Sequence, residues 1–156
     1  MLRQHVPSSC HVIGVDNSPA MIERCKANIE RDHSVASVEI LEQDLQQTPV
    51  DNASVVVLNF TLQFVPPAER GGILQRIYEG MTPGGALLLA EKIAFEDKAQ
   101  HEFMTSLHDD FKRYHDYSDL EIAQKRAALE NVMIPETVEY HTRRLQEAGF
   151  REHLTN

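Results

Sequence analysis

The sequence predicts an α/β fold built around a parallel, doubly wound sheet. Short apolar segments alternate with segments of helical periodicity over about the first 90 residues, which is typical of such sheets. The clearest strand covers 54–60, where valine and leucine follow one another without a polar break. A continuous run of this kind indicates a strand that is buried on both faces. In such sheets ligands bind at the carboxyl ends of the strands.

Each element has its own local signal. We expect strands at 11–16, 38–41, 54–60 and 86–92, with a turn at Pro83-Gly84-Gly85. The first helix follows Ser18 as N-cap and Pro19 at its first position, and Ile22, Cys25 and Ile29 form its apolar face. A second helix opens at 66–70 and turns Ile73, Leu74 and Ile77 inward. A last helix is expected at 137–148, with Gly149 as its C′ residue.

The pattern changes at about residue 96. From there to about 134 the chain is polar and helical, with Phe103, Leu107 and Phe111 as an apolar stripe. We expect a helical insertion that packs over one edge of the sheet. The length of 156 residues suits one domain, so residues 1–156 are taken as a single domain that carries this insertion.

Composition narrows the range of functions. The net charge is −9, whereas a protein that grips nucleic acid through phosphates is usually basic, so no direct nucleic-acid binding is expected. The two cysteines form neither a disulfide framework nor a zinc motif. The N-terminal residues lack a signal-peptide core and the longest apolar run is too short for a membrane span, so a cytoplasmic protein is expected.

Polar side chains stand where the predicted strands end. Asp16, Asp44, Asn59 and the pair Glu91-Lys92 would lie along one edge of a parallel sheet. Loops are polar in general, which is the simpler explanation for any one of these residues taken alone. Together they predict a site for an adenosine-containing cofactor. Asp16 would accept from ribose hydroxyls, Asp44 from an adenine amino group beside the Leu45 amide, and Asn59 would position the amino-acid portion or the reacting group.

An acid at a strand end also occurs in nicotinamide-dependent enzymes. Those enzymes cradle a pyrophosphate on a Gly-x-Gly-x-x-Gly turn. None of the seven glycines forms that motif.

Several segments resemble a known family. They are Val15 to Cys25, Val56 to Phe64, Pro83 to Leu87, His108 to Arg113, Gln124-Lys125-Arg126 and Leu129 to Met133. Together they are similar to the carboxy-S-adenosyl-L-methionine synthase family, which belongs to the class I S-adenosylmethionine-dependent methyltransferases. The resemblance covers nearly the whole chain, and the segment Gln124-Lys125-Arg126 is more specific than the first three. It implies a Rossmann-like class I methyltransferase fold.

The resemblance also implies a reaction. Members of the family convert S-adenosyl-L-methionine and prephenate to carboxy-S-adenosyl-L-methionine and phenylpyruvate. Carbon dioxide released from prephenate is captured on the methyl group of the cofactor through a sulfonium ylide. A tRNA-modifying carboxymethyltransferase then uses the product to make uridine-5-oxyacetic acid at the wobble position. The helical insertion is associated with a homodimer.

Carried over residue by residue, the resemblance assigns six positions. It places Asp16 and Asn17 at the ribose, Asp44 and Leu45 at the adenine, Asn59 beside the methionine part, and Arg126 at the new carboxylate. A guanidinium fork suits a carboxylate because it pairs both oxygens. No catalytic residue is assigned. His101, His108, Asp109, Asp110 and His115 could suggest a metal, but the family needs none and no metal site is expected.

The sequence departs from the family pattern at both ends. The family's first strand, with its glycine loop, and its last strand pair have no counterpart, so the predicted fold is incomplete and the inner edges of the strands at 11–16 and 54–60 would be exposed. Three hypotheses stay open: a carboxy-S-adenosylmethionine synthase, an ordinary methyltransferase, and a non-catalytic remnant that acts as a dimerisation module. Arg126 separates the first two, because simple methyl transfer involves no carboxylate on the cofactor.

Overall fold

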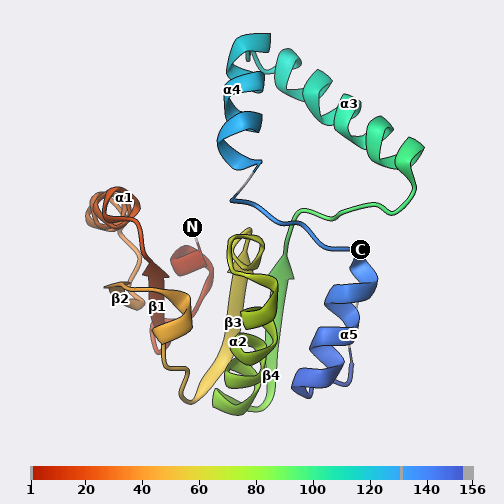
Figure 1. Cartoon of the computed structure of the whole chain (residues 1–156). Helices are drawn as coiled ribbons and strands as arrows, with labels where there is room; N and C mark the ends of the chain where they lie inside the picture. Colours follow the sequence, from red (N-terminus) through yellow and green to blue (C-terminus); the bar gives the residue numbers. More distant parts are fainter. Residues whose placement is uncertain (1, 131, 153–156) are drawn as a thin grey trace. The chain divides into compact units, whose positions relative to one another are not determined.

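The computed structural model describes residues 2–130 and 132–152 (Figure 1). The chain forms two compact units, residues 1–49 and 50–156. The strands of the described residues make two separate two-stranded parallel sheets, one in each unit. No helix among the described residues is long and apolar enough to cross a membrane.

The first unit is built around one parallel strand pair. Its elements are a 3-10 turn η1 (Leu2–His5), β1 (His11–Asp16), α1 (Pro19–Glu30), β2 (Ser37–Glu42) and a 3-10 turn η2 (Leu45–Gln47). The register of β1 and β2 runs from His11 opposite Ser37 to Asp16 opposite Glu42. Helix α1 packs on both strands and buries Ile22, which is 3% exposed.

The second unit holds the other strand pair and most of the helices. Its elements are β3 (Ala53–Asn59), a 3-10 turn η3 (Leu62–Phe64), α2 (Pro67–Gly80), β4 (Met81–Ala90), α3 (Lys98–Tyr114), α4 (Asp119–Leu129) and α5 (Val138–Ala148). Helix α2 packs against α5, and the Tyr78 ring meets the Phe150 ring edge-on at 5.1 Å between centroids. The buried hydrophobic core of the unit includes Leu58, Leu62, Ile73, Leu74 and Ile77.

Most predicted elements are confirmed, with small differences at their ends. Strand β4 begins at Met81, earlier than predicted, and the expected turn at 83–85 lies inside it as an irregularity. The register passes from Ala53 opposite Met81 to Val55 opposite Ala86, and Gly84 takes a φ of +80° there. The Ser18 side chain makes no capping bond, and the Ser18 backbone amide donates to Asp16. Cys25 is half-buried.

The expectation that the third strand is buried on both faces is wrong for the described residues. Val55 and Val57 are 55% and 48% exposed, whereas Leu58 is 4% exposed. Successive side chains of a strand point to opposite faces, so one face of β3 is covered and the other is open. Hydrophobic residue type predicted burial, but burial also requires a covering layer.

The insertion is a helical hairpin of α3 and α4 (Figure 1). The insertion was expected to pack over one edge of the sheet, but its apolar stripe is open: Phe103, Leu107 and Phe111 are 65%, 52% and 59% exposed. Helical spacing predicts that these side chains share a face. It does not predict what that face contacts.

Candidate functional site

In the first unit, four predicted site residues meet at the carboxyl end of the strand pair. The Gln43 amide donates to the Asp16 carbonyl at 3.1 Å, which places the end of β2 beside the end of β1. Asn17 Nδ2 donates to Asp44 Oδ1 at 2.9 Å. Leu45 follows Asp44 directly as the first residue of η2. Asp16, Asn17 and Asp44 are all exposed.

This cluster is suited to a ligand that carries hydroxyl and amino groups. Asp16 Oδ1 accepts from the Ser18 amide at 2.8 Å, which fixes the carboxylate just before α1. Among the residues that the structure describes, no donor reaches Asp16 Oδ2. That oxygen and the Asp44 carboxylate face solvent as acceptors, the groups that ribose hydroxyls and an adenine amino group require. The residues present therefore fit the adenosine half of S-adenosylmethionine.

In the second unit, Asn59 is the exposed last residue of β3 and precedes a sharp turn. Phe60 takes a φ of +53°, and its amide donates to the Ala90 carbonyl at 2.7 Å. The Glu91 carboxylate accepts from the amides of residues 61, 62 and 63 at 3.1, 2.7 and 3.1 Å. Glu91 was expected at the ligand edge, but it binds its own chain instead.

Arg126 lies on α4 and reaches across the hairpin to α3. Its guanidinium pairs with Asp109, whose other oxygen lies 3.6 Å from Lys112 Nζ. The Arg126 side chain is 59% exposed, whereas that of Asp109 is 13% exposed. Two cations thus share one carboxylate, and the remaining donors of the Arg126 fork face solvent. The sequence singled out Arg126 but not its pairing with Asp109.

A buried ionic network lies beside the turn after β3, and sequence reasoning missed it. Arg70 is fully buried, donates to the carbonyls of Val65, Gln63 and Ile134, and pairs with Glu136. Arg144 pairs with both oxygens of Glu136 at 2.7 and 2.6 Å. An arginine at the start of an amphipathic helix ordinarily reads as solvated, so its sequence gives no signal of this burial.

The electrostatics of this network can be followed in two titratable groups. Burial opposes ionisation of Glu136, but hydrogen bonds from Arg144 and Arg70 outweigh it and hold the pKa of Glu136 below its ordinary value. His141 is 7% exposed, and neither ring nitrogen has a partner among the described residues. Burial lowers the pKa of His141, so the imidazole is kept neutral.

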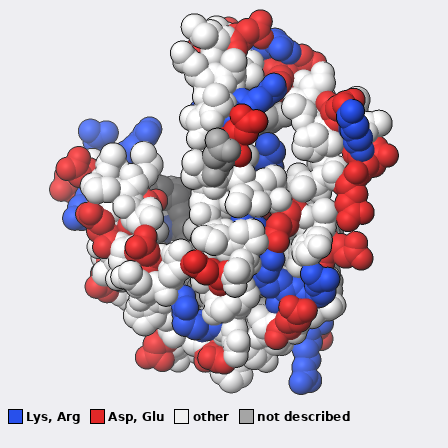
Figure 2. Space-filling view, in the orientation of Figure 1, with Lys and Arg blue, Asp and Glu red and all other residues white. Residues whose placement is uncertain are grey.

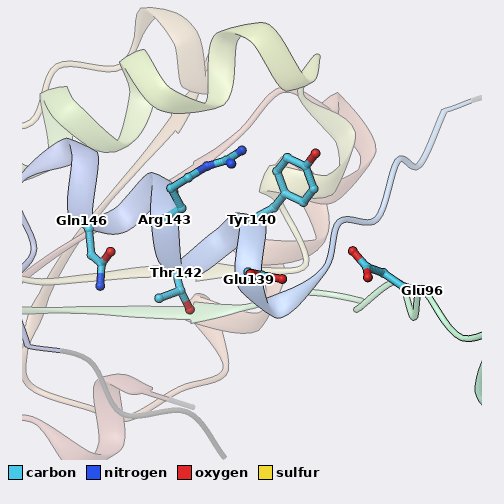
Figure 3. Close-up of a pocket in the computed structure, with 6 residues that line it drawn as sticks. All are labelled: Glu96, Glu139, Tyr140, Thr142, Arg143 and Gln146. Atoms are coloured by element: carbon cyan, nitrogen blue, oxygen red, sulfur yellow. The ribbon is translucent and has the colours of Figure 1, made fainter.

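A surface hollow of about 440 Å³ lies over α5 (Figure 3). Residues Glu139, Tyr140, Thr142, Arg143 and Gln146 line it from the helix, and Glu96 lines it from the segment after β4. None of the six predicted site residues is among them. On the face drawn in Figure 2, acidic and basic side chains are interspersed rather than gathered by sign.

The structure thus brings Asp16, Asn17, Asp44 and Leu45 together in the first unit. Asn59 and Arg126 both lie in the second unit, but on β3 and α4 respectively. The ligand roles assigned to these residues stay predictions. In the part of the chain that the structure describes, no group of three or more His, Cys, Asp or Glu side chains could hold a metal ion.

Comparison with known proteins defines the class to which this fold belongs. A family model described as a methyltransferase domain matches residues 1–85, and the chain belongs to that family. Solved structures agree on the fold. The cyclopropane synthase MmaA2 from Mycobacterium tuberculosis superposes with a TM-score of 0.64 at 15% identity, covering 89% of this chain and 46% of that one. The S-adenosylmethionine-dependent methyltransferase SibL gives a TM-score of 0.60 at 19% identity, covering 92% and 38%.

Within the methyltransferase class, the sequence is similar to curated carboxy-S-adenosyl-L-methionine synthases. The protein of that name from Hahella chejuensis is 59% identical over 141 residues, which are 90% of this chain and 57% of the relative. The one from Trichlorobacter lovleyi is 56% identical over 151 residues, which are 96% and 62%. The chain therefore spans about three fifths of the length of these relatives.

Proposed function

We propose that the chain belongs to a carboxy-S-adenosyl-L-methionine synthase, which converts S-adenosyl-L-methionine and prephenate to carboxy-S-adenosyl-L-methionine and phenylpyruvate. The similarity of 51–59% to proteins of that name, over 90% or more of the chain, carries this proposal. It extends through the helical hairpin, which contains Arg126. The hairpin is the part that an ordinary methyltransferase reading does not explain.

The residues divide the cofactor between them. Asp16 and Asn17 bind the ribose, and Asp44 with the Leu45 amide binds the adenine. Asn59 positions the methionine part. Two acceptors support the adenosine assignments: the Asp16 carboxylate, held by the Ser18 amide, and the Asp44 carboxylate, held by the Asn17 side chain. S-Adenosylmethionine supplies the methyl carbon to which the carboxyl group is transferred.

Arg126 binds the carboxylate that distinguishes the product from S-adenosylmethionine. Its exposed guanidinium is held on one side by Asp109, and Lys112 adds a second positive charge nearby. The side-chain charges of Arg126, Lys112 and Asp109 therefore sum to +1, which complements one carboxylate.

Binding of the two forms of the cofactor tests this assignment. We expect Arg126→Leu to weaken the binding of carboxy-S-adenosylmethionine by about 10-fold or more, the range for a lost charge-assisted hydrogen bond. The affinity for S-adenosylmethionine should stay unchanged. Arg143→Leu is the matched control, since the Arg143 side chain is 62% exposed and, among the described residues, contacts only its own helix, through a 3.9 Å pair with Glu147 and the Tyr140 ring. Equal weakening of both ligands by Arg126→Leu would refute the carboxylate role.

The hairpin also supports a homodimer, because it exposes Phe103, Leu107 and Phe111 along one face of α3. We expect Leu107→Asp to lower the dimer fraction in sedimentation velocity, with Lys98→Asp as an exposed control on the same helix. An unchanged dimer would place the interface elsewhere, and a monomeric wild type would contradict the proposed homodimer.

The proposal also covers the fate of the product and the place of the enzyme in the cell. The product passes to a tRNA-modifying carboxymethyltransferase, and the enzyme works in the cytoplasm without binding nucleic acid itself.

Thermal unfolding with and without S-adenosylmethionine is the first test of the proposal as a whole. A ligand that binds only the native state, at about 100 times its dissociation constant, adds about 2.7 kcal/mol. An upward shift of the midpoint supports the cofactor site, and consumption of prephenate that depends on S-adenosylmethionine then tests the reaction. A shift without prephenate consumption would favour an ordinary methyltransferase. No shift would count against cofactor binding by this chain.

A further inference from the structure

The turn that follows β3 holds an unusual backbone conformation. Phe60 has a φ of +53°, in the left-handed region that large side chains rarely adopt. Such conformations persist only where surrounding contacts enforce them, and they cluster at functional sites. Phe60 stands directly after Asn59, the residue assigned to the methionine part of the cofactor. The contacts that enforce this turn therefore bear on the site.

One side chain holds the backbone directly after Phe60. Glu91, which follows the last residue of β4, accepts hydrogen bonds from the amides of Thr61, Leu62 and Gln63. These three amides immediately follow Phe60, so the carboxylate fixes the exit of the turn. The entry is fixed by the Phe60 amide, which donates to the Ala90 carbonyl at 2.7 Å. Both anchors belong to the end of β4, which ties the turn to the neighbouring strand.

Gln63, the last of these three residues, is also held by contacts of its side chain and its carbonyl. Gln63 is 5% exposed, and its side-chain oxygen accepts from the Lys92 amide at 2.9 Å. Its carbonyl accepts from Arg70 and from the Ile134 amide. Both Glu91 oxygens are engaged by backbone amides, so Glu91 serves the fold of the turn.

We propose that Glu91 is a positioning residue of the cofactor site. It holds the Asn59-Phe60 turn in the geometry that receives the methionine part of S-adenosylmethionine. This inference rests on the proposed function, since it takes the role of Asn59 from there. Without the carboxylate, the amides of Thr61, Leu62 and Gln63 lose their common acceptor. Phe60 then relaxes to a negative φ, and the side chains on either side of that peptide change direction.

Two substitutions at one position and one control test the proposal. Glu91→Gln keeps the shape but replaces one acceptor oxygen with an NH₂ group, and Glu91→Ala removes both acceptors. Glu96→Gln is the matched control, because it removes the same charge from an exposed side chain of the segment that follows β4. Hydrogen exchange at individual amides reports the turn. Calorimetric titration with S-adenosylmethionine, below the unfolding transition of every variant, reports the site.

In Glu91→Gln, we expect the amides of Thr61, Leu62 and Gln63 to exchange about 10-fold faster, while the Leu88 and Leu89 amides in β4 keep their protection. Cofactor affinity should fall by about 10-fold, as for loss of a hydrogen bond to a charged group. The affinity of Glu91→Ala for the cofactor should fall further, and that of Glu96→Gln should stay within about 2-fold of wild type. If only Glu91→Ala fails to fold, Glu91→Gln still decides the result.

The outcomes separate this inference from the proposal on which it rests. Wild-type affinity in a Glu91→Gln variant whose turn exchanges faster would overturn the positioning role and leave the cofactor site standing. Unchanged exchange at residues 61–63 would show that the Glu91 carboxylate does not hold the turn. A wild-type chain that does not bind S-adenosylmethionine would overturn the proposed function, and the positioning role would fall with it. A uniform rise in exchange over α2, β3 and β4 would show a purely structural role, which also contradicts the inference.

Discussion

Replacing Glu136 by glutamine should strongly destabilise the second unit. Glu136 is the shared partner of Arg70 and Arg144, whose side chains are 0% and 12% exposed. The substitution keeps the shape of the side chain but leaves two buried guanidinium groups without a counter-charge. Removing one member of a buried ion pair destabilises by about 3–5 kcal/mol. The free energy of unfolding of a typical domain is about 5–15 kcal/mol, so much of the stability would be lost.

A carboxylate on α5 provides the matched control. Glu147 also pairs with an arginine of that helix, Arg143, but at 3.9 Å and with both side chains more than 60% exposed. Exposed pairs contribute at most about 1 kcal/mol. Urea unfolding at pH 7 should therefore move the midpoint far more for Glu136→Gln than for Glu147→Gln. Equal shifts in the two variants would refute the reasoning that burial decides the value of the pair.

The pH dependence of the same variant provides an independent check. Burial disfavours the charged form of Glu136, but the hydrogen bonds of Arg144 and Arg70 prevail and the pKa of Glu136 is lowered in the folded state. The contribution of this group is thus present above the unfolded value, about 4.3. It is lost as the pH falls through the folded value. Wild type and Glu136→Gln should differ most near neutrality and approach one another in acid.

Four further predictions concern His141, two glycines and one pair of glutamates. Burial lowers the pKa of His141, so the unfolded state binds more protons and stability should fall as the pH drops below about 6.5. In His141→Leu this dependence should be weaker over pH 7.5–5.5, and an unchanged slope would contradict it. Gly80→Ala would place a Cβ 2.0 Å from the Val50 carbonyl oxygen and should destabilise by about 1–3 kcal/mol. Gly71→Ala meets nothing within 4 Å and should stabilise by about 0.5–1 kcal/mol, with the urea midpoint as readout for both. Finally, Glu91→Gln and Glu136→Gln should be coupled by more than about 0.5 kcal/mol in a double-mutant cycle. Glu91 accepts from the Gln63 amide, and Glu136 pairs with Arg70, which donates to the Gln63 carbonyl. Additive effects of the two substitutions would exclude that link.

The strands and most helices were predictable because their signals are local. The valine-rich run at 54–60 and the Pro66-Pro67 opening of α2 depend on residue type and spacing, which the sequence displays directly. The irregularity inside β4 was only half visible. The Pro83-Gly84-Gly85 segment signals a break, but whether the chain turns or bulges depends on pairing with β3.

Burial and side-chain pairing were the parts that the sequence could not supply. Phe103 and Val55 have the residue types of a core, yet both are more than half exposed, because nothing among the described residues covers their faces. Arg70 has the residue type of a surface and is fully buried. The pairing of Arg126 with Asp109 joins two helices across a turn, and no spacing rule predicts a contact of that kind.

The candidate site shows the same division between local and distant causes. Asp16, Asn17 and Asp44 could be grouped from sequence because the ends of adjacent parallel strands meet by geometry alone. Asn59 could be placed at a strand end for the same reason, but what fixes its turn could not be read in this way. Gln63 connects Glu91 to the Arg70-Glu136 network, since its amide donates to Glu91 and its carbonyl accepts from Arg70. The turn beside the proposed cofactor site is therefore held by a chain of buried polar contacts that reaches α5. A change on that helix can reach the site through Gln63 without touching the ligand.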